Sequence, residues 1–312
     1  MTNFRSKAAQ VAAVAVRMAL GVLFVVSAVA KLLSIDEFEI YLFSYDVLSL
    51  RLSMLAARLV IVAEALVGIG LLANVWNRFV NICALLMVVV FTVFLCLSAL
   101  AGRTDNCHCM GSIIEMNPTQ SIVKNAVLLV LLLVAAGARP WRWKPRWYLW
   151  LPAILIPTVT VFVVSAPDYW LFGPQEEIYN REELDKAIAP EGELAPAGLA
   201  NGKHVVAFLS PGCPYCHMAD EKLTHIEMRN RLNKEAFVCF IPMKDSTMIP
   251  MSVDSTAFTH PCYRLTNMTY ALITYGQRPM VFLIEDGAVK ATCHYRNIDE
   301  RQITLFLNDD EK

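Results

Sequence analysis

Two pairs of closely spaced cysteines are the residues of this sequence best suited to chemistry. Cys213 and Cys216 are separated by two residues, and Cys107 and Cys109 by a single one. A cysteine thiolate is a nucleophile and also a ligand for soft metals, so each pair suits either thiol–disulfide exchange or metal binding. The remaining five of the nine cysteines are scattered, which is not the pattern of a small disulfide-stapled protein: Cys83, Cys96, Cys239, Cys262 and Cys293.

The elements around Cys213 favour redox chemistry. The apolar run Lys203–Ser210 predicts a buried strand, and Met218–Leu232 predicts a helix. Cys213 then lies where a helix begins, and the unpaired backbone N–H groups and the helix dipole stabilise a thiolate there. We expect Cys213 to attack a client or partner, and Cys216, one helical turn on, to resolve the mixed disulfide.

Two other interpretations of this motif stay open. Cys213-Pro-Tyr-Cys216-His217 also has the spacing of a c-type haem attachment site, although that use needs no strand before it. The other alternative is that Cys213 and Cys216 form a structural disulfide or an inactive site.

The rest of the C-terminal part predicts a small α/β domain. Asp286-Gly287 is a hairpin turn signal between two strands. The predicted elements are strands at Phe237–Ile241, Met280–Glu285 and Ala288–Tyr295, and helices around Tyr263–Ile273 and at Asp299–Leu307.

This domain resembles the thioredoxin superfamily over Lys203–Leu307. The Cys-Pro-Tyr-Cys sequence is typical of glutaredoxins, and the following His217 is similar to that of periplasmic disulfide isomerases. The resemblance implies that Pro279, after Arg278, is a cis-proline facing the active site.

The N-terminal part has the composition of a membrane protein. The chain is 56% hydrophobic and 18% charged, with a mean hydropathy of +0.46, whereas soluble domains hold about 25% charged residues. Arg17 and the length of the first apolar run favour an uncleaved helix over a signal peptide. Five stretches predict membrane spans: Val11–Leu32, Leu52–Ala73, Phe79–Leu100, Ile122–Ala138 and Tyr148–Ala166.

Basic residues predict the orientation of these spans. They gather before the first span, between the second and third, and between the fourth and fifth, which puts the N-terminus in the cytoplasm. With five crossings, the loop carrying Cys107 and Cys109 and the C-terminal domain both face the periplasm. The basic residues are Arg5, Lys7, Arg78, Arg139, Arg142, Lys144 and Arg146.

Charged residues at membrane depth are expected to face the bundle. For Arg17 and Glu64 we favour an ion pair that fixes packing over a proton relay. Lys124, near the outer end of its span, is expected to extend toward the membrane surface.

The Cys107/Cys109 loop allows two kinds of chemistry. A disulfide across one residue closes a small, strained and easily reduced ring, which suits a pair that passes electrons on. Alternatively, Cys107, His108 and Cys109 could hold Cu(I) or zinc. They could also be ordinary loop cysteines.

The membrane part resembles the DoxX/MauE-type proteins, most closely the methylamine-utilisation MauE group, over Arg17–Arg139. That group usually has Cys-Gly-Cys-Phe-Gly, and here His108 and Met110 replace Gly and Phe. The resemblance implies redox maturation of disulfide-rich periplasmic proteins. The residues that carry it are Arg17-Met-Ala-Leu-Gly-Val-Leu-Phe24, Lys31-Leu, Glu64-Ala-Leu-Val-Gly68, Phe91-Thr-Val-Phe94, Cys107-x-Cys109-x-Gly111 and Lys124-Asn125.

The scattered cysteines are expected to have structural roles. Cys83 and Cys96 lie inside the third span as small packing residues, and Cys239 lies in a strand core. A disulfide between Cys262 and Cys293 is possible in an oxidising compartment.

The sequence therefore predicts an all-α transmembrane bundle followed by an α/β thioredoxin-like domain. The domains are 1–146 (MauE/DoxX-like, four spans), 147–170 (fifth span), 171–202 (linker and entry segment) and 203–312 (thioredoxin-like). The predicted function is membrane-bound thiol–disulfide exchange in the inner membrane, with redox-active disulfides and no other cofactor. Partners are the lipid bilayer and exported cysteine-containing clients or another thiol redox protein; a net charge of −1 argues against nucleic acid. The alternative function is a non-enzymatic copper- or zinc-handling or assembly factor.

Overall fold

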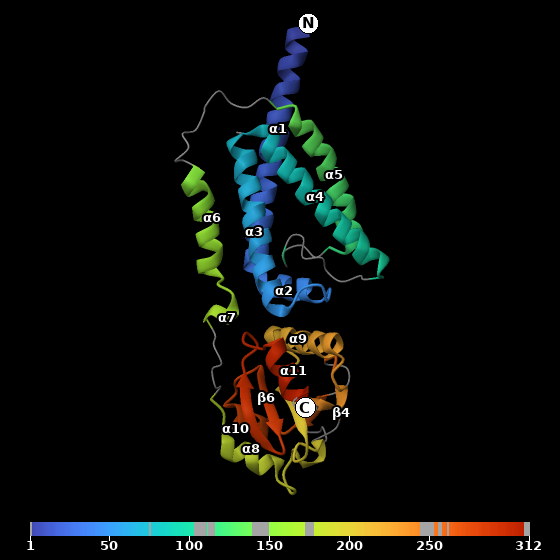
Figure 1. Ribbon diagram of the computed structural model, residues 1–312, viewed down its shortest axis with the longest axis vertical. Helices are drawn as coiled ribbons and strands as arrows, with labels where there is room; N and C mark the ends of the chain where they lie inside the picture. Colours follow the sequence, from blue (N-terminus) through green and yellow to red (C-terminus); the bar gives the residue numbers. More distant parts are fainter. Residues whose placement is uncertain are drawn as a thin grey trace. The chain divides into compact units, whose positions relative to one another are not determined.

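The computed structural model divides into two compact units. It describes residues 2–74, 76–102, 111, 116–138, 150–171, 178–243, 253–254, 258–260 and 262–308. One unit comprises Met1–Leu42 and Met54–Ala166, and the other comprises Phe43–Ser53 and Pro167–Lys312. The first is helical and the second contains the sheet (Figure 1).

The first unit is a bundle of long apolar helices. Among the described residues, four helices are long and apolar enough to cross a membrane, so the prediction of four spans in this part is confirmed and the chain is a multi-pass membrane protein. A short helix, α2 (Ile35–Phe43), follows the first of them. The four are α1 (Thr2–Leu33), α3 (Leu50–Ala73), α4 (Asn77–Leu100) and α5 (Pro118–Ala136).

Small residues let two of these helices approach closely. A Cβ atom on Gly21 of α1 would lie 3.0 Å from the carbonyl oxygen of Gly68 on α3, and one on Gly68 would lie 3.0 Å from that of Gly21. Lipid tails are as apolar as leucine, so such backbone contact replaces hydrophobic burial as the source of helix association. Leucine, valine and alanine side chains of α1, α3, α4 and α5 fill the centre of the bundle.

The fifth apolar stretch forms a shorter helix. This helix, α6 (Trp150–Val164), has 15 residues and contains Pro157. At 1.5 Å per residue it is about 22 Å long, less than the roughly 30 Å hydrocarbon core of a bilayer. A fifth crossing, which would need residues flanking α6, stays a prediction.

The second unit contains a six-stranded mixed sheet in the order β4-β5-β3-β2-β6-β7. With its helices it is a thioredoxin-like domain, as predicted. The strands are β2 (Lys203–Phe208), β3 (Phe237–Pro242), β4 (Val253–Asp254), β5 (Cys262–Leu265), β6 (Met280–Glu285) and β7 (Ala288–Cys293). The helices include α9 (Pro214–Asn230), α10 (Asn267–Thr274) and α11 (Glu300–Asn308).

The register of the sheet positions the candidate active site. Strand β2 runs parallel to β3 and antiparallel to β6, and Phe208 at the end of β2 pairs with Met280 at the start of β6. Pro279 therefore lies beside the chain that leaves β2 toward Cys213. The β6–β7 hairpin turns through Asp286 and Gly287, with φ of 49° and 77°, the positive values that a type I′ turn requires.

Part of the predicted linker belongs to the fold. Arg181–Ile188 forms a helix, α8, whose first turn is capped by Asn180. Leu184, Leu194 and Leu199 are fully buried in the core that β2 and β6 share. The C-terminal part of 171–202, predicted as a linker and entry segment, therefore belongs to the core of the domain, because these leucines cover one face of the sheet.

Candidate thiol–disulfide site

Cys213 and Cys216 lie at the beginning of α9. Cys213 is the N-cap residue, with an extended backbone, and Pro214 takes the first helical position, where proline's missing N–H is not needed. The backbone N–H of Cys216 donates to the Cys213 carbonyl at 3.0 Å. Cys213 is half-buried and Cys216 is fully buried, so the first sulfur is the one a client can reach.

The two thiols are electrostatically unequal. Burial, and a hydrogen bond to the Cys213 sulfur, raise the pKa of Cys216 to about 12; Arg278 opposes this rise. Cys216 is consequently a thiol at neutral pH and a poor nucleophile until its proton is removed. This inequality suits a resolving role, in which Cys216 acts only after Cys213 has reacted.

Arg278 and Pro279 lie just before β6, whose first residue pairs with the last residue of β2. The Arg278–Pro279 peptide bond is cis. Arg278 donates from Nη1 to the Ser210 hydroxyl at 3.3 Å, which ties this loop to the chain just before Cys213. The structure thus brings Cys213, Cys216 and Pro279 together.

A buried polar cluster lies further along α9 and was not predicted. His260 binds Asp220 through Nδ1 at 3.0 Å and Glu227 through Nε2 at 2.8 Å, and both carboxylates come from α9. Burial opposes both charges, yet these contacts raise the pKa of His260 and, with Thr259, lower the pKa of Asp220. The sequence does contain a signal for this cluster. Asp220 and Glu227 are seven residues apart, which puts both carboxylates on one face of a helix.

The disulfide of this domain does not join the two cysteines that the sequence suggested. Cys239 of β3 is bonded to Cys262 of β5, which is its partner in the parallel ladder. Cys293 is a free, buried cysteine. The suggested Cys262–Cys293 pairing is therefore wrong, and Cys239 is a bonded residue as well as a core residue.

The intramembrane ion pair involves a lysine in place of Arg17. Lys31 donates to both carboxylate oxygens of Glu64, at 2.7 and 2.8 Å, and to Ser27 at 2.8 Å. Arg17 instead donates to Asn81 on α4. The predicted Arg17–Glu64 pair is wrong because Glu64 lies at the level of Lys31, about 21 Å along α1 from Arg17.

A cavity of about 50 Å³, lined by apolar residues as well as by polar ones, adjoins this pair. Lys124 is half-buried and lines the cavity, so its side chain faces the bundle. The other lining residues include Ser27, Lys31, Glu64, Phe91 and Asn125.

Cys107, His108 and Cys109 lie outside the described residues, so their geometry is not part of this site. Gly111, two residues after Cys109, is described and has φ of +63°. A Cβ atom there would lie 2.4 Å from the carbonyl oxygen of Ala30. Only glycine fits, which explains the glycine of the Cys-x-Cys-x-Gly motif.

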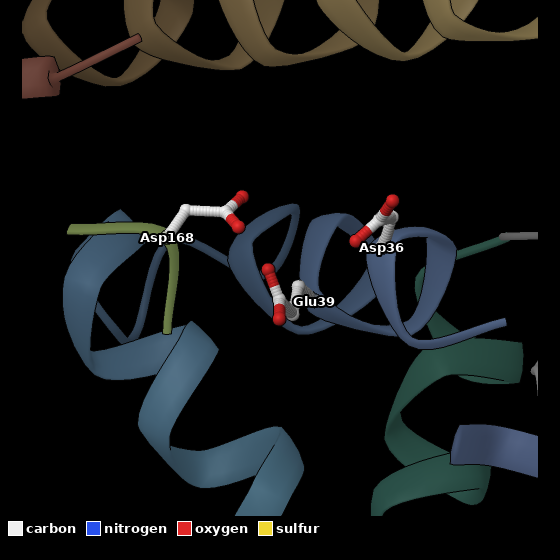
Figure 2. Close-up of side chains that lie close together, drawn as sticks. All are labelled: Asp36, Glu39 and Asp168. Atoms are coloured by element: carbon white, nitrogen blue, oxygen red, sulfur yellow. The ribbon is translucent and has the colours of Figure 1, made fainter. Parts of the chain in front are cut away.

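Three further carboxylates have structural contacts. Asp36 and Glu39 project from α2, and Asp168 lies at the start of α7 (Asp168–Leu171), as Figure 2 shows. Within the first unit, Glu39 forms a buried ion pair with Arg58. Within the second, Asp168 faces Arg296 at 3.6 Å.

Comparison with known proteins identifies the membrane unit. Residues 9–138 match the family model described as Methylamine utilisation protein MauE. The methylamine utilization protein MauE of Paracoccus denitrificans is 30% identical over 128 residues, which are 40% of this chain and 69% of that protein. The chain belongs to the MauE family. The MauE region contains all four long spans and the Cys107/Cys109 loop.

A second relative extends beyond the MauE region. Protein TlpB of Flavobacterium psychrophilum is 24% identical in an alignment of 296 positions that covers 79% of this chain and 80% of that protein. Its similarity therefore extends beyond the region that matches MauE and into the C-terminal part of the chain. No solved structure matches this chain.

Proposed function

We propose that this MauE-family protein is a membrane-bound thiol–disulfide oxidoreductase. The observation that carries the proposal is the asymmetric pair at the start of α9, a reachable Cys213 and a buried Cys216 whose pKa is about 12. A haem attachment site would need neither the buried strand β2 before the two cysteines nor the β6–β7 hairpin after them. A purely structural disulfide would not need one reachable thiol.

The proposed reaction proceeds through a mixed disulfide. The Cys213 thiolate attacks one sulfur of a client disulfide, the client S–S bond breaks, and the departing client sulfur takes up a proton. The Cys216 thiol then loses its proton and attacks Cys213, which releases the second client thiol. The client gains two electrons and two protons as Cys213 and Cys216 form a disulfide; the reverse sequence oxidises a client.

We further propose that the Cys107/Cys109 pair exchanges electrons with this site on the periplasmic face of the inner membrane. One observation supports a shared compartment. The loop between the first two spans, Phe43–Ser53, belongs to the same compact unit as the thioredoxin-like domain. Within that unit, Arg51 forms an ion pair with Asp299 at 2.5 Å. Clients are then exported proteins with cysteines, or another thiol redox protein.

Trapping the mixed disulfide tests this function. In a Cys216→Ala variant, Cys213 attacks but cannot be released, so we expect covalent adducts that dithiothreitol removes. A Cys213→Ala variant and a Cys293→Ala variant are the controls, and neither substitution should produce adducts. Absence of adducts with Cys216→Ala, together with no reduction of insulin disulfides by the full-length protein, would overturn the proposal.

A further inference from the structure

The three loops around Cys213 share an unusual charge composition. We define the active-site rim as residues 211–217, 275–279 and 293–297. It contains no aspartate and no glutamate, although the chain as a whole has 28 of them. It does contain two arginines and two histidines: Arg278, Arg296, His217 and His294.

Side-chain contacts connect these loops around the nucleophile. The Tyr215 ring, between the two cysteines, lies 4.9 Å from the Tyr295 ring with an interplanar angle of 31°. Arg278 donates to the hydroxyl of Ser210, the residue just before the first of these loops. Tyr215 is 47% exposed, so its outer face is available to a client.

The positive charge of the rim is held in place by its packing. Lys222 of α9, 1% exposed, donates to the Tyr295 carbonyl at 3.0 Å. Arg296 donates from Nε to the Tyr295 hydroxyl at 2.8 Å. Asp168, 3.6 Å from Arg296, offsets part of this charge, but its side chain is only 5% exposed and does not face a client. Arg278 is exposed, so the rim presents a positive charge beside Cys213.

We propose that this rim selects clients whose reactive disulfide is flanked by acidic residues. The inference rests on the proposed oxidoreductase function and names its substrate class. Complementary charge raises the rate of encounter and disfavours partners of like charge. Tyr215 supplies an apolar surface for the client backbone beside Cys213, and Arg278 supplies the exposed positive charge.

The test measures the reduction of three disulfide peptides by the full-length, dithiol form of the protein in a non-ionic detergent. The peptides are identical except that Glu, Ser or Lys residues flank the disulfide. At roughly 10 mM ionic strength, where the Debye length is about 30 Å, we expect the acidic peptide to react about tenfold faster than the basic one. At about 1 M salt, where that length is about 3 Å, the ratio should fall close to one.

Substitutions locate the effect. Arg278→Gln should reduce the preference for the acidic peptide at low salt about threefold, by removing one charge. Lys290→Gln is the matched control, because Lys290 pairs with Glu285 at the other end of β6 from Pro279, and it should leave the preference unchanged. The salt dependence of the unmodified protein decides the question even if Arg278→Gln does not fold.

The outcomes separate the inference from the function on which it rests. Equal rates for the three peptides, or a faster basic peptide, would overturn the acidic-client inference and leave the oxidoreductase function standing. No reduction of any peptide would count against the function itself.

Discussion

Lys31 binds both carboxylate oxygens of Glu64, at 2.7 and 2.8 Å, and so joins α1 to α3 inside the membrane unit. The Lys31 and Glu64 side chains are 1% and 10% exposed. A charge in this position is stable only while its partner is present, because burial without a counter-charge is expensive.

Removing one partner of this pair should destabilise the bundle. We expect Lys31→Met to lower the free energy of unfolding by about 3–5 kcal/mol, since Glu64 is left without its cation. The double variant Lys31→Met/Glu64→Leu should recover most of the loss. Thermal unfolding in detergent measures both. A single variant as stable as the unmodified protein would show that the ion pair does not stabilise the bundle.

The two thiols of the active site should differ in their rates of alkylation. A thiol with a pKa of about 12, as in Cys216, holds only about one thiolate in ten thousand at pH 8, and that fraction rises tenfold for each pH unit. Iodoacetamide should therefore label Cys213 first in the reduced protein, as read by peptide mass spectrometry. Faster labelling of Cys216 than of Cys213 at pH 8 would contradict the assigned roles.

His260 should make the stability of the C-terminal domain depend on pH. Its pKa is raised, so its contribution is complete below the unfolded value of about 6.5 and disappears as pH rises through the folded value. The pKa of Asp220 is lowered, so its contribution is present above about 3.9 and disappears as pH falls through the folded value.

The His260→Gln variant tests this dependence. We expect it to lose about 2–3 kcal/mol near pH 5.5, where both groups are charged, because a charge-assisted pair of hydrogen bonds is removed. The loss should shrink above the folded pKa of His260. Pulse proteolysis across a urea series measures the difference at each pH. A loss that stays constant with pH would mean that His260 contributes only by packing.

The Cys239–Cys262 disulfide should stabilise the domain without taking part in exchange. Its cysteines are 23 residues apart, and closing a loop of that size stabilises by about 3 kcal/mol. Cys239→Ala/Cys262→Ala should lose about this much in urea unfolding, and Cys293→Ala should lose far less. Insulin reduction at low temperature, where the variant stays folded, should be unaffected; loss of that activity would give the bond a redox role.

Local sequence patterns predicted the helices and strands of this protein more successfully than they predicted which residues pair between them. Apolar length gave the four spans, and β-branched runs gave β2, β3 and β6, because both signals are contained in the segment itself. The helix α8 was missed although Leu184, Ala187 and Ile188 have helical spacing, because the surrounding Glu, Pro and Gly residues are typical of linkers.

Pairings were harder because they depend on how elements are arranged in space. Glu64 binds Lys31 and not Arg17 because α3 packs against α1 with Glu64 at the level of Lys31. Cys262 binds Cys239 because β5 lies next to β3, and the four-residue β5 itself was not predicted. The His260 cluster has the same origin, since α9 and the chain before β5 meet only in the folded domain.

The central claim is that the two dithiols exchange electrons in one compartment. The most direct measurement is the redox state of Cys107 and Cys109 in cells, read by mass shift after acid quenching and thiol alkylation. Compared with the unmodified protein, a Cys213→Ser/Cys216→Ser variant should accumulate Cys107/Cys109 in a single redox state, because their exchange partner is gone. An unchanged distribution between dithiol and disulfide would contradict the account.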